Sequence, residues 1–394
     1  MTNTPLDARR TTKQIMAEQH HAGLGVIGCG GFGLFAMQQF LQVPGVTLSG
    51  ITGTHGQAAY AAAKRFGSDV VEDMNDFLAR PGTDVVYVAT PPFLHHQQVL
   101  AALRAGKHVI CEKPLAVTRA QADEMMALAR KSGLLLVTNL MQRYNPLYDK
   151  VARLIEARLL GEVLHGFFEN YASDEGLRED HWFWDRNKSG GIFIEHGVHF
   201  FDMFEGWLGS GKVESAQAAC RGDSTVEDQV NCCVRYGSST LVNHYHGFTQ
   251  AGRMDRQELR ILFERGSISL QGWIPTVARI HGLADEEDTR KLIDIFSGAR
   301  LDVTAVYGGK DRECRGRFKA LDVYQQFELA YGLGTEKFHV YGDLLRAMFT
   351  DQLAWTKNRD HQRKITEDNG YRALLVAIEA DKLAHGDGGR FPER

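Results

Sequence analysis

The segment 24–41, with the sequence LGVIGCGGFGLFAMQQFL, constrains the fold of this chain most strongly. One apolar run predicts a buried strand over 24–27, and a second predicts a helix over 34–41. Between them lie three glycines in G-x-G-x-x-G order, which are Gly28, Gly30 and Gly33. A strand, a glycine turn and a helix in this order are typical of a βαβ unit that binds a dinucleotide.

Each glycine of this motif has its own role in such a unit. Gly28 allows the tight turn, Gly30 lets backbone amides approach the pyrophosphate, and Gly33 lets the helix pack on the strand. The N-terminus of the helix adds a partial positive charge for the phosphates. We therefore assign the whole loop to cofactor binding, namely Gly28, Gly30, Gly31, Phe32 and Gly33.

Length, charge and composition exclude several classes of protein. The chain has 394 residues and is 43% hydrophobic, which is enough for a large core and about two domains. Its net charge of −4 predicts neither a nucleic-acid nor a membrane-lipid surface, and no run of about 20 apolar residues predicts a membrane span. The six cysteines form no C-x-x-C pair, which favours free thiols. We therefore expect a soluble, cytoplasmic protein.

The pattern of apolar residues divides the chain into three parts. The polar residues 1–20 predict a flexible tail or one loose helix. Their arginine pair does not predict an export signal, because no apolar segment follows it. Alternating strand and helix patterns over 21–144 predict a doubly wound parallel sheet. Runs that alternate at period two, such as 229–236 and 258–264, predict an α/β domain with a large open mixed, mostly antiparallel sheet over 145–394.

Two further loops of the first domain directly follow predicted strands. Thr90 and Pro91 begin one of these loops, and Glu112 and Lys113 begin the other. Ligands of a doubly wound sheet bind at the carboxyl ends of its strands, so we expect both loops to meet the glycine loop at one crevice. We assign these four residues to cofactor binding, together with His95 at the start of the next helix.

The residues after the second strand leave the choice between NAD and NADP open. In dinucleotide folds an acidic residue about 20 positions past the glycines holds the adenine ribose 2′-hydroxyl. This chain has Gly53, Thr54 and His55 there, so no carboxylate repels a 2′-phosphate and no arginine attracts one. We assign Thr54 and His55 to cofactor binding and expect NAD, with NADP as the alternative.

Two side chains are suited to move protons during hydride transfer. Lys113 leaves a strand beside the expected nicotinamide, where it can hydrogen-bond a substrate hydroxyl and stabilise the alkoxide. His199 can accept the hydroxyl proton, because histidine titrates near neutrality. If Glu195 begins a helix, Glu195, His199 and Asp202 share one face and the carboxylates orient the imidazole. The alternatives are a surface lysine and a structural, hydrogen-bonded histidine.

A zinc site is a further alternative for the histidine-rich segments. Glu195, His196 and His199 could combine with His244 and His246, which share one face of a predicted strand. The order Glu-His-x-x-His differs from the H-E-x-x-H order of zinc hydrolases, and sixteen histidines make chance clusters common. We therefore expect no metal.

Four motifs together resemble the glucose–fructose oxidoreductase/inositol dehydrogenase (Gfo/Idh/MocA) family. They are the glycine loop, Ala89-Thr90-Pro91-Pro92 with His95, the segment from Ala105 to Glu112-Lys113-Pro114, and Gly190-Gly191 followed by Glu195, His199 and Asp202. The resemblance runs from about Gly23 to the C-terminal helix, where the segment 366–371 is also typical.

This resemblance implies a Rossmann domain, a second domain with a large open sheet, and a homo-oligomer, either a dimer or a tetramer. It also implies a nicotinamide cofactor, a sugar or cyclic polyol substrate, and Lys113 with His199 as the catalytic pair. The Lys113–Pro114 peptide is often cis in relatives. The family usually has aspartate in place of Glu195, and often an acid or Ser-Arg in place of residues 53–55.

An aromatic and charged segment is expected to line the substrate pocket if the family layout holds. Aromatic faces stack on sugar rings, and arginine or histidine suits an anionic group. Arg178, Arg186 and Lys188 favour a negatively charged sugar, and a packing cluster between domains is the alternative. The expected substrate-binding residues are Arg143, Tyr144, His181, Trp182, Trp184, Arg186, Glu195 and His199.

We expect an NAD(P)-dependent oxidoreductase that acts on a CH–OH group of a sugar, glycoside or cyclic polyol. His199 would take the hydroxyl proton and Lys113 would polarise the oxygen, while Glu195 and Asp202 orient His199 or bind hydroxyls. One alternative is an NAD-dependent glycoside hydrolase that works by transient oxidation, elimination, hydration and re-reduction. Another is a non-enzymatic dinucleotide sensor, which would need neither Lys113 nor His199.

Overall fold

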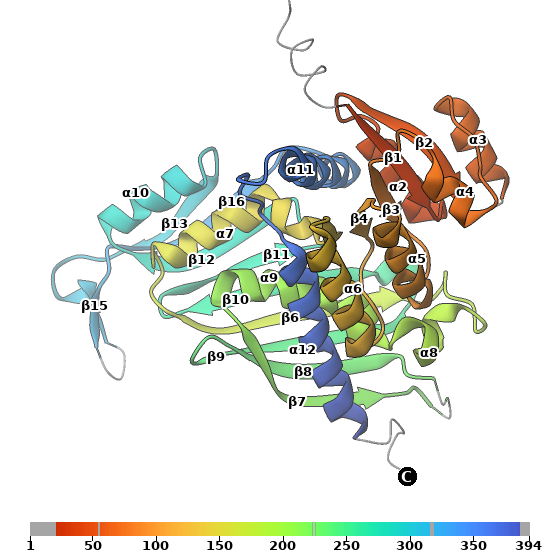
Figure 1. Cartoon of the computed structure of the whole chain (residues 1–394). Coiled ribbons are helices and arrows are strands. Elements are labelled where there is room, and N and C mark those ends of the chain that lie inside the picture. Colours follow the sequence, from red (N-terminus) through yellow and green to blue (C-terminus); the bar gives the residue numbers. More distant parts are fainter. Residues whose placement is uncertain (1–20, 54–55, 223, 225, 316–318, 387–394) are drawn as a thin grey trace, which may run out of the picture. The chain divides into compact units, whose positions relative to one another are not determined.

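The computed structural model describes residues 21–53, 56–222, 224, 226–315 and 319–386 (Figure 1). The predicted tail over 1–20 lies outside the described residues, as do the predicted cofactor residues Thr54 and His55.

Contacts between residues divide the chain into two compact units. The first contains Met1–Ala116, Ala120–Asn139 and Gly342–Asp368, and the second contains Val117–Arg119, Leu140–Tyr341 and Asn369–Arg394. The predicted domain over 145–394 differs from this division, because the stretch Gly342–Asp368 packs in the first unit.

A parallel sheet of five strands forms the centre of the first unit (Figure 1). Its strands are β1 (Ala22–Ile27), β2 (Val46–Thr52), β3 (Val85–Val88), β4 (His108–Cys111) and β5 (Leu136–Thr138). They lie in the order β2-β1-β3-β4-β5, which confirms the predicted doubly wound sheet. Every residue of β1 and β3 is buried, as expected for strands that are covered on both faces. The chain reverses its direction of travel through the sheet between β1 and β3, which is where such sheets bind ligands.

Helices follow the strands of this sheet in alternation. They are α2 (Gly31–Phe40), α3 (Gln57–Arg65), α4 (Met74–Ala79), α5 (Pro92–Arg104) and α6 (Arg119–Ser132). A later helix, α11 (Lys337–Lys357), joins them through aromatic packing. Phe349 of α11 stacks on Phe40 of α2 with ring centroids 4.5 Å apart, and Phe40 meets Tyr87 of β3 edge-on at 5.0 Å. All three rings are fully buried, so α11 completes the core of the first unit.

A sheet of nine strands forms the second unit. Its order is β13-β16-β12-β11-β10-β6-β9-β8-β7, and β6 and β9 form its one parallel pair among the described residues. This confirms the predicted open, mixed and mostly antiparallel sheet. The strands are β6 (Val163–Ser173), β7 (Gly211–Ala219), β8 (Gln229–Tyr236), β9 (Thr240–Gln250), β10 (Arg256–Phe263), β11 (Gly266–Gln271), β12 (Val277–Ala284), β13 (Arg300–Val306) and β16 (Gln325–Gly332). A separate hairpin is formed by β14 (Glu313–Arg315) and β15 (Ala320–Asp322).

Helices and short turns cover or extend this sheet. The helices are α7 (Pro146–Glu156), α8 (Arg186–Ser189), α9 (Val198–Leu208), α10 (Glu286–Ile295) and α12 (Glu367–His385). The short helical turns are η1 (Met141–Tyr144), η2 (Trp182–Trp184), η3 (Phe193–Gly197), η4 (Gly252–Met254) and η5 (Gly309–Arg312). Phe204 of α9 meets Tyr236 of β8 at 5.8 Å and His244 of β9 at 5.2 Å, so α9 packs on the buried face of the sheet.

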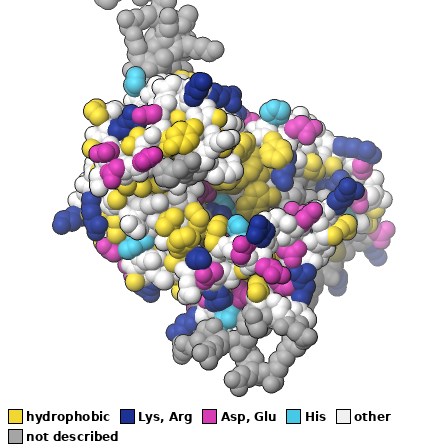
Figure 2. All heavy atoms as spheres, turned by 90° about the vertical axis from the view of Figure 1, so that its right-hand side faces the viewer, with side chains coloured by type: hydrophobic (Ala, Val, Ile, Leu, Met, Phe, Trp, Pro, Cys, Tyr) yellow, Lys and Arg dark blue, Asp and Glu magenta, His cyan; other side chains and the backbone are white. Residues whose placement is uncertain are grey.

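Within the part of the chain that the structure describes, no helix is long and apolar enough to cross a membrane. On the face drawn in Figure 2, basic and acidic side chains are interspersed, which agrees with the small net charge.

Replacing Phe349 with alanine is expected to destabilise the protein by about 3–5 kcal/mol, because the change leaves a cavity against Phe40. Denaturant unfolding of the full chain measures this loss. Tyr60→Ala is the control, because Tyr60 is 48% exposed and its removal should cost within about 0.5 kcal/mol. Equal stability of the two variants would contradict the assignment of α11 to the first core.

Candidate functional site

The glycine loop divides into positions that the fold requires and positions that leave space. Gly28 has a φ of +91°, and a Cβ there would lie 2.7 Å from the carbonyl oxygen of Ala89. A Cβ on Gly33 would lie 2.6 Å from the carbonyl oxygen of Gly28. A Cβ on Gly30 or Gly31 would meet nothing within 4 Å. Gly28 and Gly33 therefore serve the close approach of helix and strand, whereas Gly30 and Gly31 border open space.

The start of α2 fits an anionic group at this open space. The helix is capped by Gly30, which has no side chain to accept its first N–H groups, and its first turn holds no acidic residue. The backbone N–H groups and the helix dipole thus remain suited to a phosphate. Phe32, in the same turn, contacts the ring of Phe35 at 6.3 Å. These features fit the pyrophosphate of a dinucleotide.

The loops after β1, β3 and β4 lie together, as predicted. The Cβ position of Gly28 is 2.7 Å from Thr90 Cγ2, so the first two loops touch. His95 joins the second loop to the third, because its Nε2 lies 2.8 Å from the Thr90 carbonyl and its Nδ1 lies 2.8 Å from the Pro114 carbonyl. His95 is fully buried, so it fixes these loops.

Glu112 anchors the end of β4 next to Lys113. Its carboxylate accepts hydrogen bonds from the Tyr87 hydroxyl at 2.6 Å and from Asn139 Nδ2 at 2.7 Å. Burial raises the pKa of Glu112, and these two hydrogen bonds offset part of that effect. The Lys113–Pro114 peptide is cis, in agreement with the resemblance.

The motif of the second unit begins with a π-helical turn. The predicted α-helix does not begin at Glu195; Phe193–Gly197 forms a π-turn, and α9 begins at Val198. Such turns insert one extra residue per turn and often occur at functional sites. Glu195, His199 and Asp202 are all buried, at 9%, 2% and 1% exposure.

Asp202 forms a bidentate ion pair with Arg143. Arg143 Nε donates to Asp202 Oδ2 at 2.7 Å and Arg143 Nη2 donates to Oδ1 at 2.8 Å, while Asn369 Nδ2 donates to Oδ1 at 3.1 Å. Burial lowers the pKa of Arg143, but Asp202 outweighs this and raises it. A Cβ on Gly206 would lie 1.7 Å from Arg143 Nη1, so glycine lets the guanidinium cross α9. The pair therefore ties η1 to the helix that carries His199.

An aromatic residue that the sequence analysis missed lies beside the motif histidines. The Trp273 ring lies 5.1 Å from the His199 ring and 5.2 Å from the His196 ring. Gln142 Nε2 donates to the Trp273 carbonyl at 2.5 Å and holds this turn. Trp273 lies between β11 and β12, and a large aromatic residue in a short turn was the available signal.

The structure gives no support to the zinc alternative. His246 Nδ1 lies 2.9 Å from His196 Nδ1, and burial lowers the pKa of His246 to about 3. His244 is also buried and lies 3.3 Å from the Tyr236 hydroxyl. Among the described residues, no group of three or more His, Cys, Asp or Glu side chains is arranged to hold a metal.

Of the predicted substrate-binding segment, the aromatic residues gather in and around η2. His181 and Trp182 have ring centroids 5.0 Å apart, and Tyr144 ends η1 in the same unit. The three cations of the segment are each paired. Arg178 pairs with Asp180, Lys188 pairs with Asp185, and Arg186 pairs with Glu227 and Asp381. All three cations have carboxylate partners, and the expectation of a negatively charged sugar stays a prediction.

Arg186 belongs to a buried cluster that fixes the segment before Gly191. Its Nη2 donates to both oxygens of Asp381 at 2.8 Å, and its Nη1 donates to Glu227 at 3.0 Å. His385 Nε2 donates to Glu227 at 2.6 Å. A Cβ on Gly191, at φ +91°, would lie 3.0 Å from Arg186 Nη1, so the cluster accounts for this glycine.

The five-stranded parallel sheet and its glycine loop are those of a dinucleotide-binding, Rossmann-type domain. Residues 22–140 match the family model described as "Oxidoreductase family, NAD-binding Rossmann fold", and residues 148–269 match "GFO/IDH/MocA C-terminal domain". The chain belongs to the Gfo/Idh/MocA family.

Curated relatives and solved structures extend this comparison. The chain is 37% identical over 141 residues to a dTDP-3,4-didehydro-2,6-dideoxy-alpha-D-glucose 3-reductase of Actinomadura kijaniata, covering 36% of this chain and 42% of the relative. It is 34% identical over 200 residues to a 1,5-anhydro-D-fructose reductase of Ensifer adhaerens, covering 49% of this chain and 58% of the relative. These matches span about half the relatives' lengths. A levoglucosan dehydrogenase in complex with NADH shares the fold, with a TM-score of 0.74 and 19% identity over 92% of this chain and 97% of that one.

Gly30→Ala is expected to affect NADH binding, whereas Gly33→Ala is expected to affect the stability of the fold. The first should weaken NADH binding at least about tenfold and leave the melting temperature unchanged, because its methyl group enters only the open space beside α2. The second should lower the melting temperature, because its methyl group meets the Gly28 carbonyl. Titration calorimetry with NADH and thermal unfolding separate the two effects. Unchanged NADH affinity in Gly30→Ala would contradict a phosphate site here.

The buried cluster around Arg186 predicts a pH dependence of stability. Burial lowers the pKa of His385, but its hydrogen bonds to Glu227 and to the Asp381 carbonyl outweigh this and raise it. A raised pKa means that protonated His385 stabilises the fold below its ordinary pKa and that this stabilisation is lost as the pH rises through the raised pKa. The wild type should therefore lose stability above about pH 6, by up to about 1.4 kcal/mol per pH unit from this group.

His385→Gln should show a shallower loss of stability over the same range. Denaturant unfolding at several pH values measures both slopes. His339→Gln, at an exposed histidine of α11, should follow the wild type. Identical slopes for wild type and His385→Gln would refute the role of this cluster.

Proposed function

We propose that this protein is a cytoplasmic NAD(H)-dependent oxidoreductase that acts on a CH–OH group of a sugar, glycoside or cyclic polyol. The observation that carries this proposal is that the chain contains both a site suited to a dinucleotide and side chains suited to transfer a proton. The first unit holds a glycine loop with room for a pyrophosphate and has Lys113 two residues after the end of β4. The second unit holds His199 on a helix that a buried ion pair fixes. All six cysteines are free thiols, which supports a reducing compartment.

Bound NAD would supply the hydride acceptor, and the chain's own residues would handle the oxygen and its proton. Lys113 donates a hydrogen bond to the substrate oxygen and stabilises the alkoxide. His199 accepts the hydroxyl proton as the carbon–hydrogen bond breaks. Glu195 binds a neighbouring hydroxyl. Asp202 acts as a positioning residue, because Arg143 already engages both of its carboxylate oxygens.

Ring carbohydrates and cyclic polyols are the substrate class that the relatives support. The curated relatives include reductases of a dideoxyglucose derivative and of 1,5-anhydro-D-fructose, and a scyllo-inositol 2-dehydrogenase that shares 26% identity over 194 residues. We propose that His181, Trp182 and Trp184 contact the substrate, since aromatic faces bind sugars. NAD is proposed over NADP, because residues 53–55 include no arginine for a 2′-phosphate.

A homo-oligomer, either a dimer or a tetramer, is part of this proposal. The outer face of the large sheet carries half-buried aromatic residues, such as Tyr171 and Tyr245 with ring centroids 5.3 Å apart. Arg256 lies over Tyr171 at 4.7 Å. Aromatic residues and arginine are enriched at protein interfaces, which makes this face suitable for a second copy.

Lys113→Met and His199→Asn are expected to lower kcat by about 10²–10⁴-fold and to leave NADH affinity close to that of the wild type. The assay follows reduced nicotinamide and released aglycone while a panel of neutral and acidic sugars, cyclic polyols and glycosides is offered with NAD or NADP. Lys131→Met and His339→Asn are matched controls at exposed positions and should keep full activity. Wild-type rates in either test variant would refute the assigned roles.

A further inference from the structure

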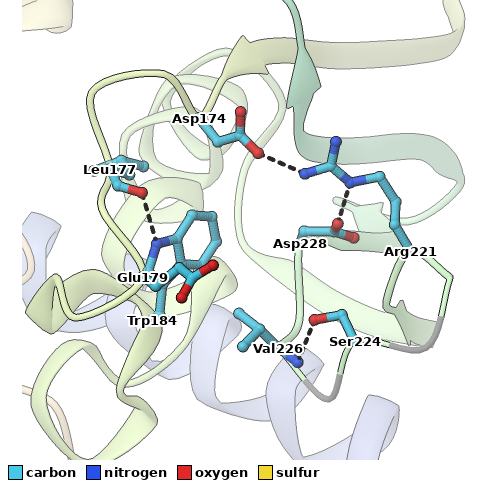
Figure 3. Close-up of a pocket in the computed structure, with 8 residues that line it drawn as sticks. All are labelled: Asp174, Leu177, Glu179, Trp184, Arg221, Ser224, Val226 and Asp228. Carbon is cyan, nitrogen blue, oxygen red and sulfur yellow. Dashed lines mark hydrogen bonds and ion pairs between the residues drawn. The ribbon is translucent and has the colours of Figure 1, made fainter.

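A cavity of about 450 Å³ lies within the second unit, at one end of the large sheet (Figure 3). Asp174 follows β6, Arg221 follows β7 and Asp228 precedes β8, so three strands deliver side chains to it. The segment before α8 adds Glu179 and Trp184. Among these residues only Trp184 belongs to the segment already proposed to contact substrate. The volume of the cavity is in the range of small-molecule sites, which is about 300–1,000 Å³.

One wall of the cavity is a fixed indole ring. Trp184 Nε1 donates to the Leu177 carbonyl at 3.2 Å, and Phe183 packs edge-on against the ring at 4.8 Å. Figure 3 shows the indole of Trp184 on one side of the cavity and the guanidinium of Arg221 on the other. A held aromatic face binds the apolar face of a pyranose ring at little cost in side-chain entropy.

The opposite wall is an ion-paired array of hydrogen-bonding groups. Arg221 Nη2 donates to Asp174 Oδ2 at 2.5 Å, and Arg221 Nε donates to Asp228 Oδ2 at 2.5 Å. Asp228 is buried, and Gln229 Nε2 donates to its Oδ1 at 3.3 Å. A carboxylate has about four acceptor positions, so this array keeps acceptors for ring hydroxyls. Paired acids and a guanidinium beside an aromatic wall are chemically suited to a polyhydroxylated ring.

The charge of the lining decides which rings fit. Asp174, Glu179 and Asp228 face the single cation Arg221 in the lining, so the balance is negative. A carboxylate or phosphate on the ligand would be repelled, whereas hydroxyl or amino substituents would not.

The cavity lies beside the motif histidines and is separated from them by one ring. Trp184 contacts Phe248 with ring centroids 6.3 Å apart, and Phe248 contacts His196 at 5.3 Å. His199 lies three residues after His196 in the sequence. We propose that the cavity is a distal subsite for a second, non-acidic sugar ring of a glycoside, while the ring to be oxidised lies at His199. This inference rests on the proposed function, and it makes a glycoside or disaccharide the preferred substrate.

Binding and turnover of sugar pairs test the subsite. The full chain is saturated with NADH and titrated calorimetrically with glucose, galactose and mannose. Each monosaccharide is paired with a disaccharide in which the same sugar is the ring to be oxidised. For at least one pair the disaccharide should bind about tenfold more tightly, as expected from one stacked ring and its hydrogen bonds. A disaccharide whose second ring is a uronate should lose this advantage in the wild type and regain part of it in Glu179→Gln.

Val226→Trp provides the decisive variant, because Val226 lines the cavity and is 40% exposed, so a larger ring can fill the space without entering the core. The ratio of disaccharide to monosaccharide affinity should fall to about one in this variant. Val306→Trp makes the same change at an exposed position of β13 outside the lining and should keep the wild-type ratio. A preference that survives in Val226→Trp, or equal binding within every pair, overturns the subsite.

Hydride transfer is read separately from binding, so the two proposals fail in different ways. Formation of reduced nicotinamide from monosaccharides, without any preference for disaccharides, leaves the oxidoreductase standing and overturns the subsite. Binding of NADH with neither binding nor turnover of any sugar overturns both.

Discussion

The ion pair between Arg143 and Asp202 is the interaction on which the second unit's motif depends. Both groups are nearly removed from solvent, and two parallel hydrogen bonds fix the guanidinium against α9. Removing one partner of a buried pair costs about 3–5 kcal/mol, because the other charge stays behind without compensation. Tyr148 accepts from Arg143 Nη1 at 2.8 Å, and Asn369 of α12 donates to Asp202. Segments far apart in sequence thereby hold His199 in one orientation.

The glycine loop shows how one short motif separates structure from binding. Gly28 and Gly33 allow backbone and helix to approach within distances that a methyl group would prevent. Gly30 and Gly31 have no such neighbours, so their absence of side chains leaves room for a ligand. The same residue type therefore serves two purposes within six positions.

Periodicity and local motifs were enough to predict the two sheets and the loops at the end of the first. The parallel strands are continuous apolar runs and the antiparallel strands alternate, which is a direct consequence of how each sheet is covered. The same local rules did not reveal the π-turn before Val198, because apolar periodicity does not distinguish a π-turn from the first turn of an α-helix. The partners of Arg186 were also invisible, because Asp381 lies 195 positions away.

The aromatic stack between Phe40 and Phe349 makes the first unit discontinuous in sequence. The chain leaves this unit after Asn139 and returns at Gly342, with the second unit's sheet between the two passages. During synthesis the parallel sheet is complete long before the helix that covers Phe40 has emerged. The core of the first unit around Phe40 is therefore completed only after the second unit's sheet has been translated.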